Sequence, residues 1–216
     1  MNQYFPSILY EDNHLIAVAK KSGEPVQPER GKPFSLEEQV KQYIKVSKRK
    51  PGDVFLGVIH RLDMPVRGIV LFAKTSKALV RMNELFKKRA IQKIYMAKVE
   101  GKLDNHQNTL THYLVRDDNK RITKAYEKQV ANSQKAVLEY EVMHFNNNAS
   151  MLKITLHTGR KHQIRVQLAK IGHPILGDVK YGASTKMDNG AIELCATLLS
   201  FEHPISKLPI QIVATF

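Results

Sequence analysis

Segments in which apolar and polar residues alternate with a period of two recur along this chain, and they constrain its fold more than any other feature. Alternation over Lys93–Gly101, Leu138–Val142 and Met151–Thr158 predicts strands with one buried and one exposed face. The uninterrupted apolar run Ile69–Ala73 indicates a central strand buried on both faces. Several strands follow one another directly, which favours an α+β protein with a mixed, mostly antiparallel sheet.

Three other segments have the apolar spacing of helices. They are Ser35–Val46, Ser76–Arg89 and His162–Ile171. The first begins with Ser35 and Glu38, which form the S-x-x-E pattern of a capping box. The second ends in a basic cluster that suits the negative end of a helix dipole. We expect these helices to flank the sheet.

The size and charge of the chain indicate the kind of partner it has. No internal repeat, low-complexity tract or long linker divides the 216 residues, so we expect one domain over residues 1–216. The 34 lysines and arginines outnumber the 20 acidic residues and give a formal net charge of +14. This surplus favours a polyanion, with nucleic acid as the first candidate and an anionic membrane surface as the second. Charge alone does not choose between DNA, RNA and lipid.

The cellular location follows from what the sequence lacks. Cys195 is the only cysteine, so no disulfide can form within the chain, and a reducing compartment is expected. The first residues do not have the pattern of a signal peptide, and no apolar stretch approaches the length of a membrane span. We therefore expect a cytoplasmic protein that does not enter a membrane.

The sequence also lacks the patterns of the common cofactor and metal sites. It contains neither the phosphate-binding G-x-x-x-x-G-K-[ST] nor the dinucleotide-binding G-x-G-x-x-G. The metal-binding patterns C-x-x-C and H-E-x-x-H and the G-x-S-x-G nucleophile elbow are missing as well. We expect no nucleotide cofactor and no metal.

Two polar segments remain as candidates for chemistry, and the first is His60–Asp63. An acidic residue follows a histidine and an arginine in a loop that leads into the buried run Ile69–Ala73. Loops carried by rigid sheets often hold functional residues. A surface ion pair or an Asx-type turn before Pro65 explains the same residues, and their spacing does not decide between these interpretations.

The second candidate segment is Thr158–Arg165, which joins a predicted strand to a predicted helix. Its backbone N–H groups and basic side chains can converge on phosphate, although a solvated basic helix start has the same composition. The neighbours of Arg165 are Ile164 and Val166, which indicates that its guanidinium is partly buried. A buried guanidinium needs a carboxylate partner, and Asp63 is the candidate.

At these residues the chain resembles a known family. HRLDMPVRGIVLFAKT (His60–Thr75) resembles the H-R-L-D-x-x-x-x-G-x-x-L-F-A-K block of the RluA-type RNA pseudouridine synthases. Four more segments resemble other blocks of that family in the same order, namely Ile8–Val26, Lys93–Gly101, Thr158–Gly182 and Leu194–Lys207. Because the matches are ordered and cover nearly the whole chain, the sequence is identified as a member of this family.

The resemblance implies a fold and a set of residue roles. The fold is that of the pseudouridine synthases, a mixed sheet with flanking helices and a central RNA-binding cleft. Asp63 matches the catalytic aspartate, Tyr95 the tyrosine that lies against the target base, and Arg165 the basic residue that pairs with the aspartate. The residues expected to contact RNA are His60, Arg61, Arg67, Arg160, Lys161, His162 and Gln163, with Arg61 matching an arginine that holds the RNA open.

The chain also departs from the family pattern. The family commonly has serine where this chain has Arg67, and commonly histidine where it has Gln167. Many relatives carry an N-terminal S4 RNA-binding domain, which we do not expect here because seven residues precede Ile8. RNA affinity is then expected from the catalytic domain itself, for example from Lys45–Lys50 and Lys87–Lys93.

The expected function is the isomerisation of specific uridines to pseudouridine in tRNA or rRNA by a monomeric enzyme. A catalytically silent RNA-binding protein on the same fold fits the net charge equally well. The joint presence of Asp63, Tyr95 and Arg165 argues against that alternative. A hydrolase of glycosidic bonds is a third alternative, but it usually needs a second positioned acid, and we expect none in the matching segments.

Overall fold

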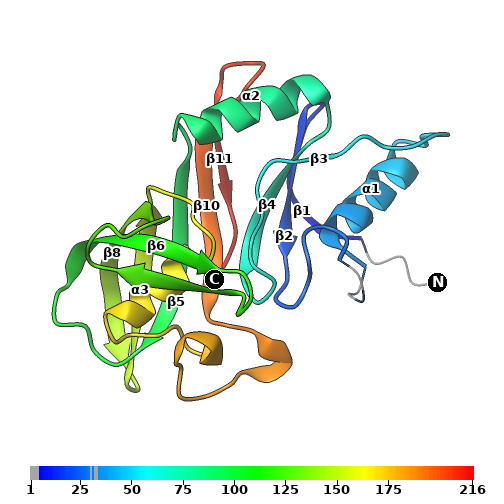
Figure 1. Cartoon of the computed structure of the whole chain (residues 1–216). Coiled ribbons are helices and arrows are strands. Elements are labelled where there is room, and N and C mark those ends of the chain that lie inside the picture. The colour runs from blue at the N-terminus through cyan, green and yellow to red at the C-terminus, as the bar shows by residue number, and fades with distance from the viewer. Residues whose placement is uncertain (1–4, 30, 32–33) are drawn as a thin grey trace. The chain divides into compact units, whose positions relative to one another are not determined.

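The computed structural model describes residues 5–29, 31 and 34–216, and this part of the chain divides into two compact units. The first unit consists of Met1–Ile91 and Ala196–Phe216, and the second of Gln92–Cys195. Figure 1 shows the elements of both units, coloured along the chain. The expectation of one domain over residues 1–216 stays a prediction.

The first unit is built on antiparallel strands with two helices. Its strands are β1 (Ser7–Glu11), β2 (Leu15–Lys20), β3 (Gly57–Val58), β4 (Arg67–Ala73), β10 (Leu194–Glu202, of which the first two residues belong to the second unit) and β11 (Pro209–Val213). The strand order is β1-β2-β4-β10, with β3 on β4 and β11 on β10. The β1–β2, β2–β4, β3–β4 and β10–β11 pairs are antiparallel. The helices are α1 (Leu36–Ser47) and α2 (Ser76–Lys87).

Strand β4 forms the centre of this unit, as the apolar run predicts. All five residues of Ile69–Ala73 are fully buried. Gly68 begins the buried part of the strand with φ of 118°, and a Cβ atom at this position would lie 2.3 Å from the carbonyl oxygen of Ala196. Only glycine fits such a backbone and such a close approach. The segment after the His60–Asp63 loop is therefore fixed tightly against β10.

Both predicted helices of the first unit are present. Ser35 and Glu38 form the expected capping box at the start of α1. Helix α2 buries Met82 and ends at Lys87, two residues before the predicted end. It ends there because Arg89 has a φ of 57°, and this left-handed conformation cannot continue a right-handed helix.

The second unit contains an antiparallel sheet covered on one face by a helix. Its strands are β5 (Gln92–Glu100), β6 (Gln107–Asp117), β7 (Ile122–Tyr126), β8 (Gln134–Asn146) and β9 (Ala149–Leu156), in the order β5-β9-β8-β6-β7. Helix α3 (Gln163–Lys170) and the 3₁₀ segments Val179–Tyr181 and Asp188–Gly190 complete it. All four strand pairs are antiparallel.

One face of this second sheet packs against α3. Leu114 of β6 and Ala136 of β8 form a buried cluster with Val166 of the helix. The helix begins at Gln163 because His162 has a left-handed φ of 55°, so the helix starts one residue after the predicted start. The expected α+β class with a mostly antiparallel sheet is confirmed.

Candidate active site

His60, the first residue of the His60–Asp63 loop, contacts the core of the first unit. The Nε2 atom of His60 accepts a hydrogen bond from the backbone N–H of Leu71 in β4 at 3.1 Å. The ring of His60 also stacks on Phe86 of α2 with the centroids 5.3 Å apart. Because Nε2 accepts, the neutral ring carries its proton on Nδ1. His60 thus holds the loop to the core, and its expected contact with RNA stays a prediction.

Asp63 lies at the first position of a tight turn and is half-buried. The backbone N–H of Val66 donates to the carbonyl oxygen of Asp63 at 3.0 Å, which closes the turn across Pro65. The turn expected as one interpretation of this segment is therefore present. It does not compete with a catalytic role, because the backbone carbonyl forms the turn while the side chain is a separate group.

A buried lysine donates hydrogen bonds to the backbone of this turn, and the sequence did not predict this role. Lys20, at the end of β2, is 2% exposed. Its Nζ atom donates to the carbonyl oxygens of Val66 at 2.6 Å, Met64 at 2.9 Å and Lys21 at 2.9 Å. Three carbonyl acceptors match the three N–H donors of an ammonium group. Lys20 is therefore the internal support of the backbone that carries Asp63.

The surroundings of Lys20 shift the pKa of its ammonium group. Burial lowers the pKa of the Lys20 ammonium to about 8, and the negative charges of Glu24 and Asp63 partly oppose this shift. The negative charge of Asp63 thus favours the charged form of Lys20.

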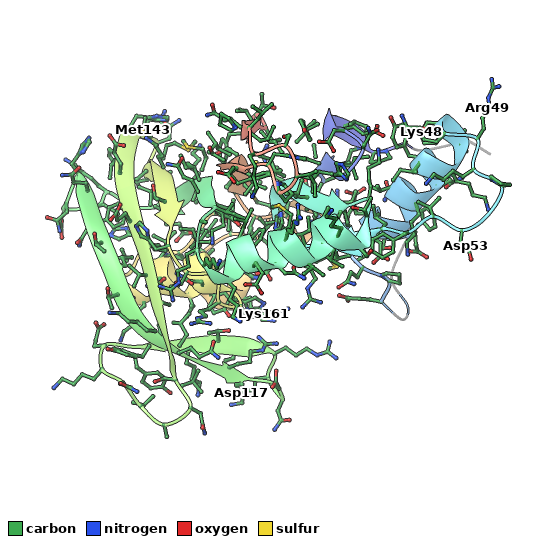
Figure 2. All side chains as sticks on the ribbon, turned by 90° about the horizontal axis from the view of Figure 1, so that it is seen from above. Lys48, Arg49, Asp53, Asp117, Met143 and Lys161 are labelled. Carbon is green, nitrogen blue, oxygen red and sulfur yellow. The ribbon has the colours of Figure 1, made fainter. Side chains whose placement is uncertain are left out.

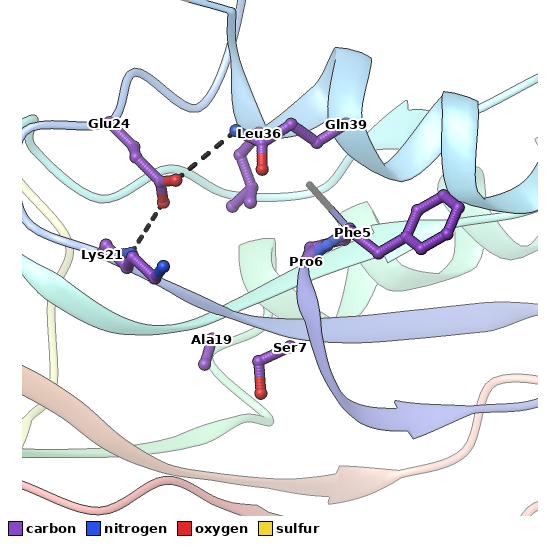
Figure 3. A pocket seen from close by; sticks show the side chains of 8 residues that line it. All are labelled: Phe5, Pro6, Ser7, Ala19, Lys21, Glu24, Leu36 and Gln39. Carbon is purple, nitrogen blue, oxygen red and sulfur yellow. Dashed lines mark hydrogen bonds between the residues drawn. The ribbon is translucent and has the colours of Figure 1, made fainter. Parts of the chain in front are cut away.

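Glu24 ties the segment after Lys20 to helix α1. Figure 3 shows a shallow pocket in the first unit where the Glu24 carboxylate accepts hydrogen bonds from the backbone N–H of Lys21 at 2.8 Å and from Nε2 of Gln39 at 3.4 Å. The backbone N–H of Gly23 donates to the carbonyl oxygen of Met64 at 2.8 Å. The turn 21–24 and the Asp63 turn thus support each other.

The two arginines of the loop have protein contacts. Arg61 is exposed and donates from Nη1 to Oε1 of Gln27 at 3.2 Å. The guanidinium of Arg67 lies over the ring of Phe216, 4.6 Å from its centroid. Arg67, which stands where the family commonly has serine, is thereby joined to the segment after β11. The expected contacts of Arg61 and Arg67 with RNA stay predictions.

In the second unit, Arg165 forms a buried ion pair with Asp178. Nε of Arg165 donates to Oδ2 of Asp178 at 2.6 Å, and Nη2 donates to Oδ1 at 2.7 Å. The side chains are 5% and 1% exposed. The expectation of a buried guanidinium with a carboxylate partner is thus confirmed within this unit. The expectation that the matching segments hold no second carboxylate is wrong, because Asp178 lies within Thr158–Gly182, but both of its oxygens are hydrogen-bonded to Arg165. Pairing of Arg165 with Asp63 stays a prediction.

Tyr181 covers the other side of the Arg165 guanidinium. The guanidinium carbon lies 5.0 Å from the centroid of the Tyr181 ring. The Tyr181 hydroxyl lies 2.6 Å from Nδ1 of His162 and accepts from the backbone N–H of Thr123 at 2.9 Å. Burial raises the pKa of this hydroxyl. Asp178 and Tyr181 therefore fix the orientation of the Arg165 guanidinium.

Gln163 organises the turn between β9 and α3. It is 3% exposed, and its Oε1 accepts from Oγ1 of Thr158 at 2.7 Å and from the backbone N–H of Arg160 at 3.0 Å. Its Nε2 donates to the carbonyl oxygen of Val137 at 3.1 Å. A contact between Gln163 and RNA would require this network to open. Lys161, by contrast, is exposed.

Gln167 is accommodated inside the second unit. The side chain is fully buried, and its Nε2 donates to the carbonyl oxygen of Leu110 at 3.2 Å and lies 3.0 Å from Nδ1 of His112. The departure from the family's common histidine thus lies in the packing between α3 and the sheet.

Tyr95 lies on β5 with its side chain on the buried face of the second sheet. It is 9% exposed and pairs in register with Ile154 of β9. Asp63 belongs to the first unit, whereas Tyr95 and Arg165 belong to the second. Their convergence into one site stays a prediction.

The structure also bears on cofactors and membranes. Among the described residues, no group of three or more His, Cys, Asp or Glu side chains is arranged to hold a metal ion. Within the same residues, no helix is both long and apolar enough to cross a membrane.

Comparison with known proteins identifies the family. The model of the RNA pseudouridylate synthase family matches residues 14–170. The chain is 30% identical to tRNA pseudouridine synthase C of Haemophilus influenzae, covering 96% of this chain and 91% of that protein. It is 31% identical to the dual-specificity RNA pseudouridine synthase RluA of Vibrio vulnificus, covering 95% and 84%. It is also 31% identical to ribosomal large subunit pseudouridine synthase D of Xylella fastidiosa, covering 96% of this chain but 65% of that protein.

The chain therefore belongs to the RNA pseudouridylate synthase family, a class of isomerases that act on uridine in RNA. Within this class it is an RluA-type member, as the ordered segments predict. The solved structure of human RNA pseudouridylate synthase domain containing 4 has the same fold, with a TM-score of 0.80 at 23% identity over 97% of this chain and 88% of that one. The expected fold and enzyme class are confirmed.

Proposed function

We propose that this protein converts specific uridines to pseudouridine in tRNA or large-subunit rRNA, with Asp63 as the catalytic carboxylate. The observation that carries the proposal is the Asp63 turn itself. It lies in the segment matched by the family model, and the buried Lys20 holds its backbone through Met64 and Val66. The relatives named above include both a tRNA pseudouridine synthase and a large-subunit rRNA pseudouridine synthase, which supports these two substrate classes.

The reaction requires a charged carboxylate near the sugar and a cation beside it, and these residues can provide both. The N1–C1′ bond of uridine breaks, the uracil turns, a C5–C1′ bond forms, and C5 loses its proton. No net oxidation or hydrolysis occurs, so the proposal includes no nucleotide cofactor and no metal. An ionised Asp63 either attacks C1′ as a nucleophile or removes a proton from the sugar. Both steps require the carboxylate to be charged, which a nearby cation favours.

In this proposal the second unit supplies the remaining groups. Arg165, oriented by Asp178, provides the positive charge beside Asp63. Tyr95 offers an aromatic ring against which a flipped-out uracil stacks. The enzyme is proposed to act as a monomer in the cytoplasm, and light scattering of the purified protein tests the first of these statements.

Tritium release tests the catalytic assignment. RNA labelled at C5 of uridine and purified from cells that lack the gene should lose tritium to water when the enzyme is added. Asp63→Asn and Asp63→Ala should bind this RNA but release no tritium. Normal turnover by Asp63→Asn would exclude Asp63 as the catalytic carboxylate.

A second measurement separates the enzyme from a catalytically silent RNA-binding protein. Pseudouridine is mapped in all stable RNAs from cells with and without the gene. Loss of one or a few pseudouridines identifies the target. An unchanged map together with retained RNA binding would support the silent binder. Release of free uracil would instead indicate a hydrolase.

A further inference from the structure

Two tyrosines and a lysine form a row across three strands of the second unit. Tyr113 of β6 is the register partner of Tyr126 on β7 and of Lys135 on β8. Residues directly opposite one another on neighbouring antiparallel strands point to the same face of the sheet. Lys124, two residues before Tyr126, shares this face. Arg160 lies beside Lys135 at the end of the row, because its Nε donates to the carbonyl oxygen of Lys135 at 3.3 Å. We call these five residues the tyrosine face.

The tyrosine face lies on the opposite side of the sheet from α3. Leu114 follows Tyr113 in β6, and Ala136 follows Lys135 in β8. Both point to the opposite face of the sheet, where they pack against Val166 of α3. Tyr95 points to the same side as α3. Its register partner on β9 is Ile154, and the partner of Ile154 on β8 is Tyr140. Tyr140 is four residues after Ala136 on the same strand, so both side chains point to the α3 side. The tyrosine face is therefore distinct from the face that carries the candidate catalytic tyrosine.

The positive charges of this face, on Lys124, Lys135 and Arg160, have no ion-pair partners among the described residues. All three side chains are at least partly accessible, with Lys124 and Lys135 exposed. A cluster of unpaired cations attracts a polyanion.

The neighbouring acidic residues form no ion pair with these cations, and their contacts are with other groups. Glu127 lies 3.6 Å from His112 and 3.7 Å from Lys170. Asp118 pairs with Arg116 at 3.1 Å. Glu139 lies 3.2 Å from Nε2 of His157, and Asp117, at the end of β6 (Figure 2), accepts the backbone N–H of Lys120 at 3.0 Å.

The edge strand that carries Tyr126 is anchored to the helix side of this unit. Thr123 of β7 is 4% exposed, and its Oγ1 donates to the carbonyl oxygen of Lys161 at 3.1 Å. Its backbone N–H donates to the hydroxyl of Tyr181 at 2.9 Å. Because these bonds anchor β7, and β7 pairs in turn with β6, the strands that carry Tyr126 and Tyr113 are held in place, which limits the entropy cost when a ligand stacks on the rings.

We propose that the tyrosine face is a second RNA-binding surface, on which unpaired bases stack against Tyr113 and Tyr126 while phosphates contact Lys124, Lys135 and Arg160. Aromatic rings beside cations on a sheet are the chemistry with which proteins hold single-stranded RNA without reading its sequence. The identity of the bound RNA as substrate rests on the proposed function. Binding itself does not, since it can be measured without turnover.

Fluorescence anisotropy with a fluorescein-labelled, unstructured 20-nucleotide RNA tests the proposal. The ring variant is Tyr113→Leu/Tyr126→Leu, and the charge variant is Lys124→Gln/Lys135→Gln. The control is Lys102→Gln/Lys186→Gln, which removes two exposed lysines of the same unit that lie outside β6, β7 and β8. Circular dichroism and the urea midpoint verify that each variant is folded.

The two variants should differ in a way that a general loss of structure would not produce. The ring variant should raise Kd at least about fivefold with an unchanged salt slope, because stacking is not ionic. The charge variant should lower the slope of log K against log salt by about 0.7 for each phosphate that the substituted side chains no longer neutralise. The control should leave both quantities unchanged. Unchanged Kd and slope in both test variants, or binding of a protein rather than RNA to this face, would overturn the proposal.

The same RNA-binding measurements are made in the Asp63→Asn background, so that turnover does not affect them. In otherwise wild-type protein, tritium release from total labelled RNA should show a raised KM and an unchanged kcat for both test variants. If wild-type protein releases no tritium but the variants still bind RNA more weakly, the proposed function fails and the binding surface stands. Ultraviolet crosslinking of the RNA to Tyr113 or Tyr126 provides direct confirmation.

Discussion

The guanidinium of Arg165 and the carboxylate of Asp178 are joined by two hydrogen bonds, of 2.6 and 2.7 Å, and both side chains are buried. The bidentate geometry leaves the guanidinium little freedom to rotate. Removing one partner of such a pair leaves an uncompensated charge in the interior, which is much more costly than removing both. Asp178 is therefore a positioning residue for Arg165.

Asp178→Asn should lower the free energy of unfolding by about 3–5 kcal/mol, because the buried Arg165 charge loses its partner. Urea denaturation measures this change. The matched control is Glu139→Gln, since Glu139 is half-exposed and lies against His157 at the surface, where the cost should be below about 1 kcal/mol. Arg165→Met/Asp178→Leu should recover most of the stability but no tritium release. An equal loss of stability in Asp178→Asn and the control would contradict the assigned role.

Lys20→Met should reduce tritium release strongly while RNA binding is retained. The substitution keeps the side-chain length but leaves the carbonyl oxygens of Met64, Val66 and Lys21 without their donor. We expect a loss of about 2–4 kcal/mol in the free energy of unfolding, offset in part by the removal of a buried charge. Lys77→Met, on an exposed position of α2, is the control and should change neither quantity. Wild-type kcat in Lys20→Met would show that the Asp63 turn needs no internal support.

Much of the fold could be predicted because its determinants are local. The capping box of Ser35 and Glu38, the apolar run Ile69–Ala73 and the alternation of β9 each depend on neighbouring residues in the sequence. The short strand β7 did not stand out because its five residues do not alternate regularly between apolar and polar, and it is held by long-range bonds from Thr123 to Lys161 and Tyr181.

The supporting groups of the site were harder to predict, since their roles depend on partners far away in the sequence. Lys20 lies 44 and 46 residues before the carbonyl groups it binds, and a lysine at a strand end is ordinarily solvated. Asp178 lies 13 residues after Arg165, beyond the end of α3. The available signals were the lysine directly after the apolar residues of β2 and an acid in the same matched segment as the arginine.

The pKa of Lys20 predicts opposite effects of alkaline pH on activity and on stability. Above a pKa of about 8 the neutral amine has two N–H donors for three carbonyl oxygens, so kcat should fall on the alkaline side. In the unfolded chain the same group titrates at its ordinary pKa of 10.5, so the unfolded state binds more protons between about 8 and 10.5. The stability that Lys20 contributes therefore increases as pH rises from about 8 toward 10.5, and it is lost as pH falls through 8.

This pH dependence is checked by measuring kcat and the urea midpoint from pH 6 to pH 10, roughly the span that brackets both protonation states. The residual activity of Lys20→Met should lack the alkaline fall, which separates Lys20 from other groups that titrate in this range. A parallel fall of activity and stability in the wild-type protein would point to general alkaline unfolding and not to the titration of Lys20.

The contact between Arg67 and Phe216 predicts a measurable coupling between the Asp63 segment and the segment after β11. The guanidinium lies 4.6 Å from the ring centroid, and a contact of this kind stabilises by about 0.5–1 kcal/mol at a partly exposed site. A double-mutant cycle of Arg67→Met and Phe216→Leu, read as free energies of unfolding, should show a coupling of this size.

RNA-binding measurements separate this role of Arg67 from a direct contact with phosphate. If Arg67 binds RNA, Arg67→Met alone lowers the salt slope while Phe216→Leu leaves it unchanged; if Arg67 acts only through the ring, neither substitution changes the slope.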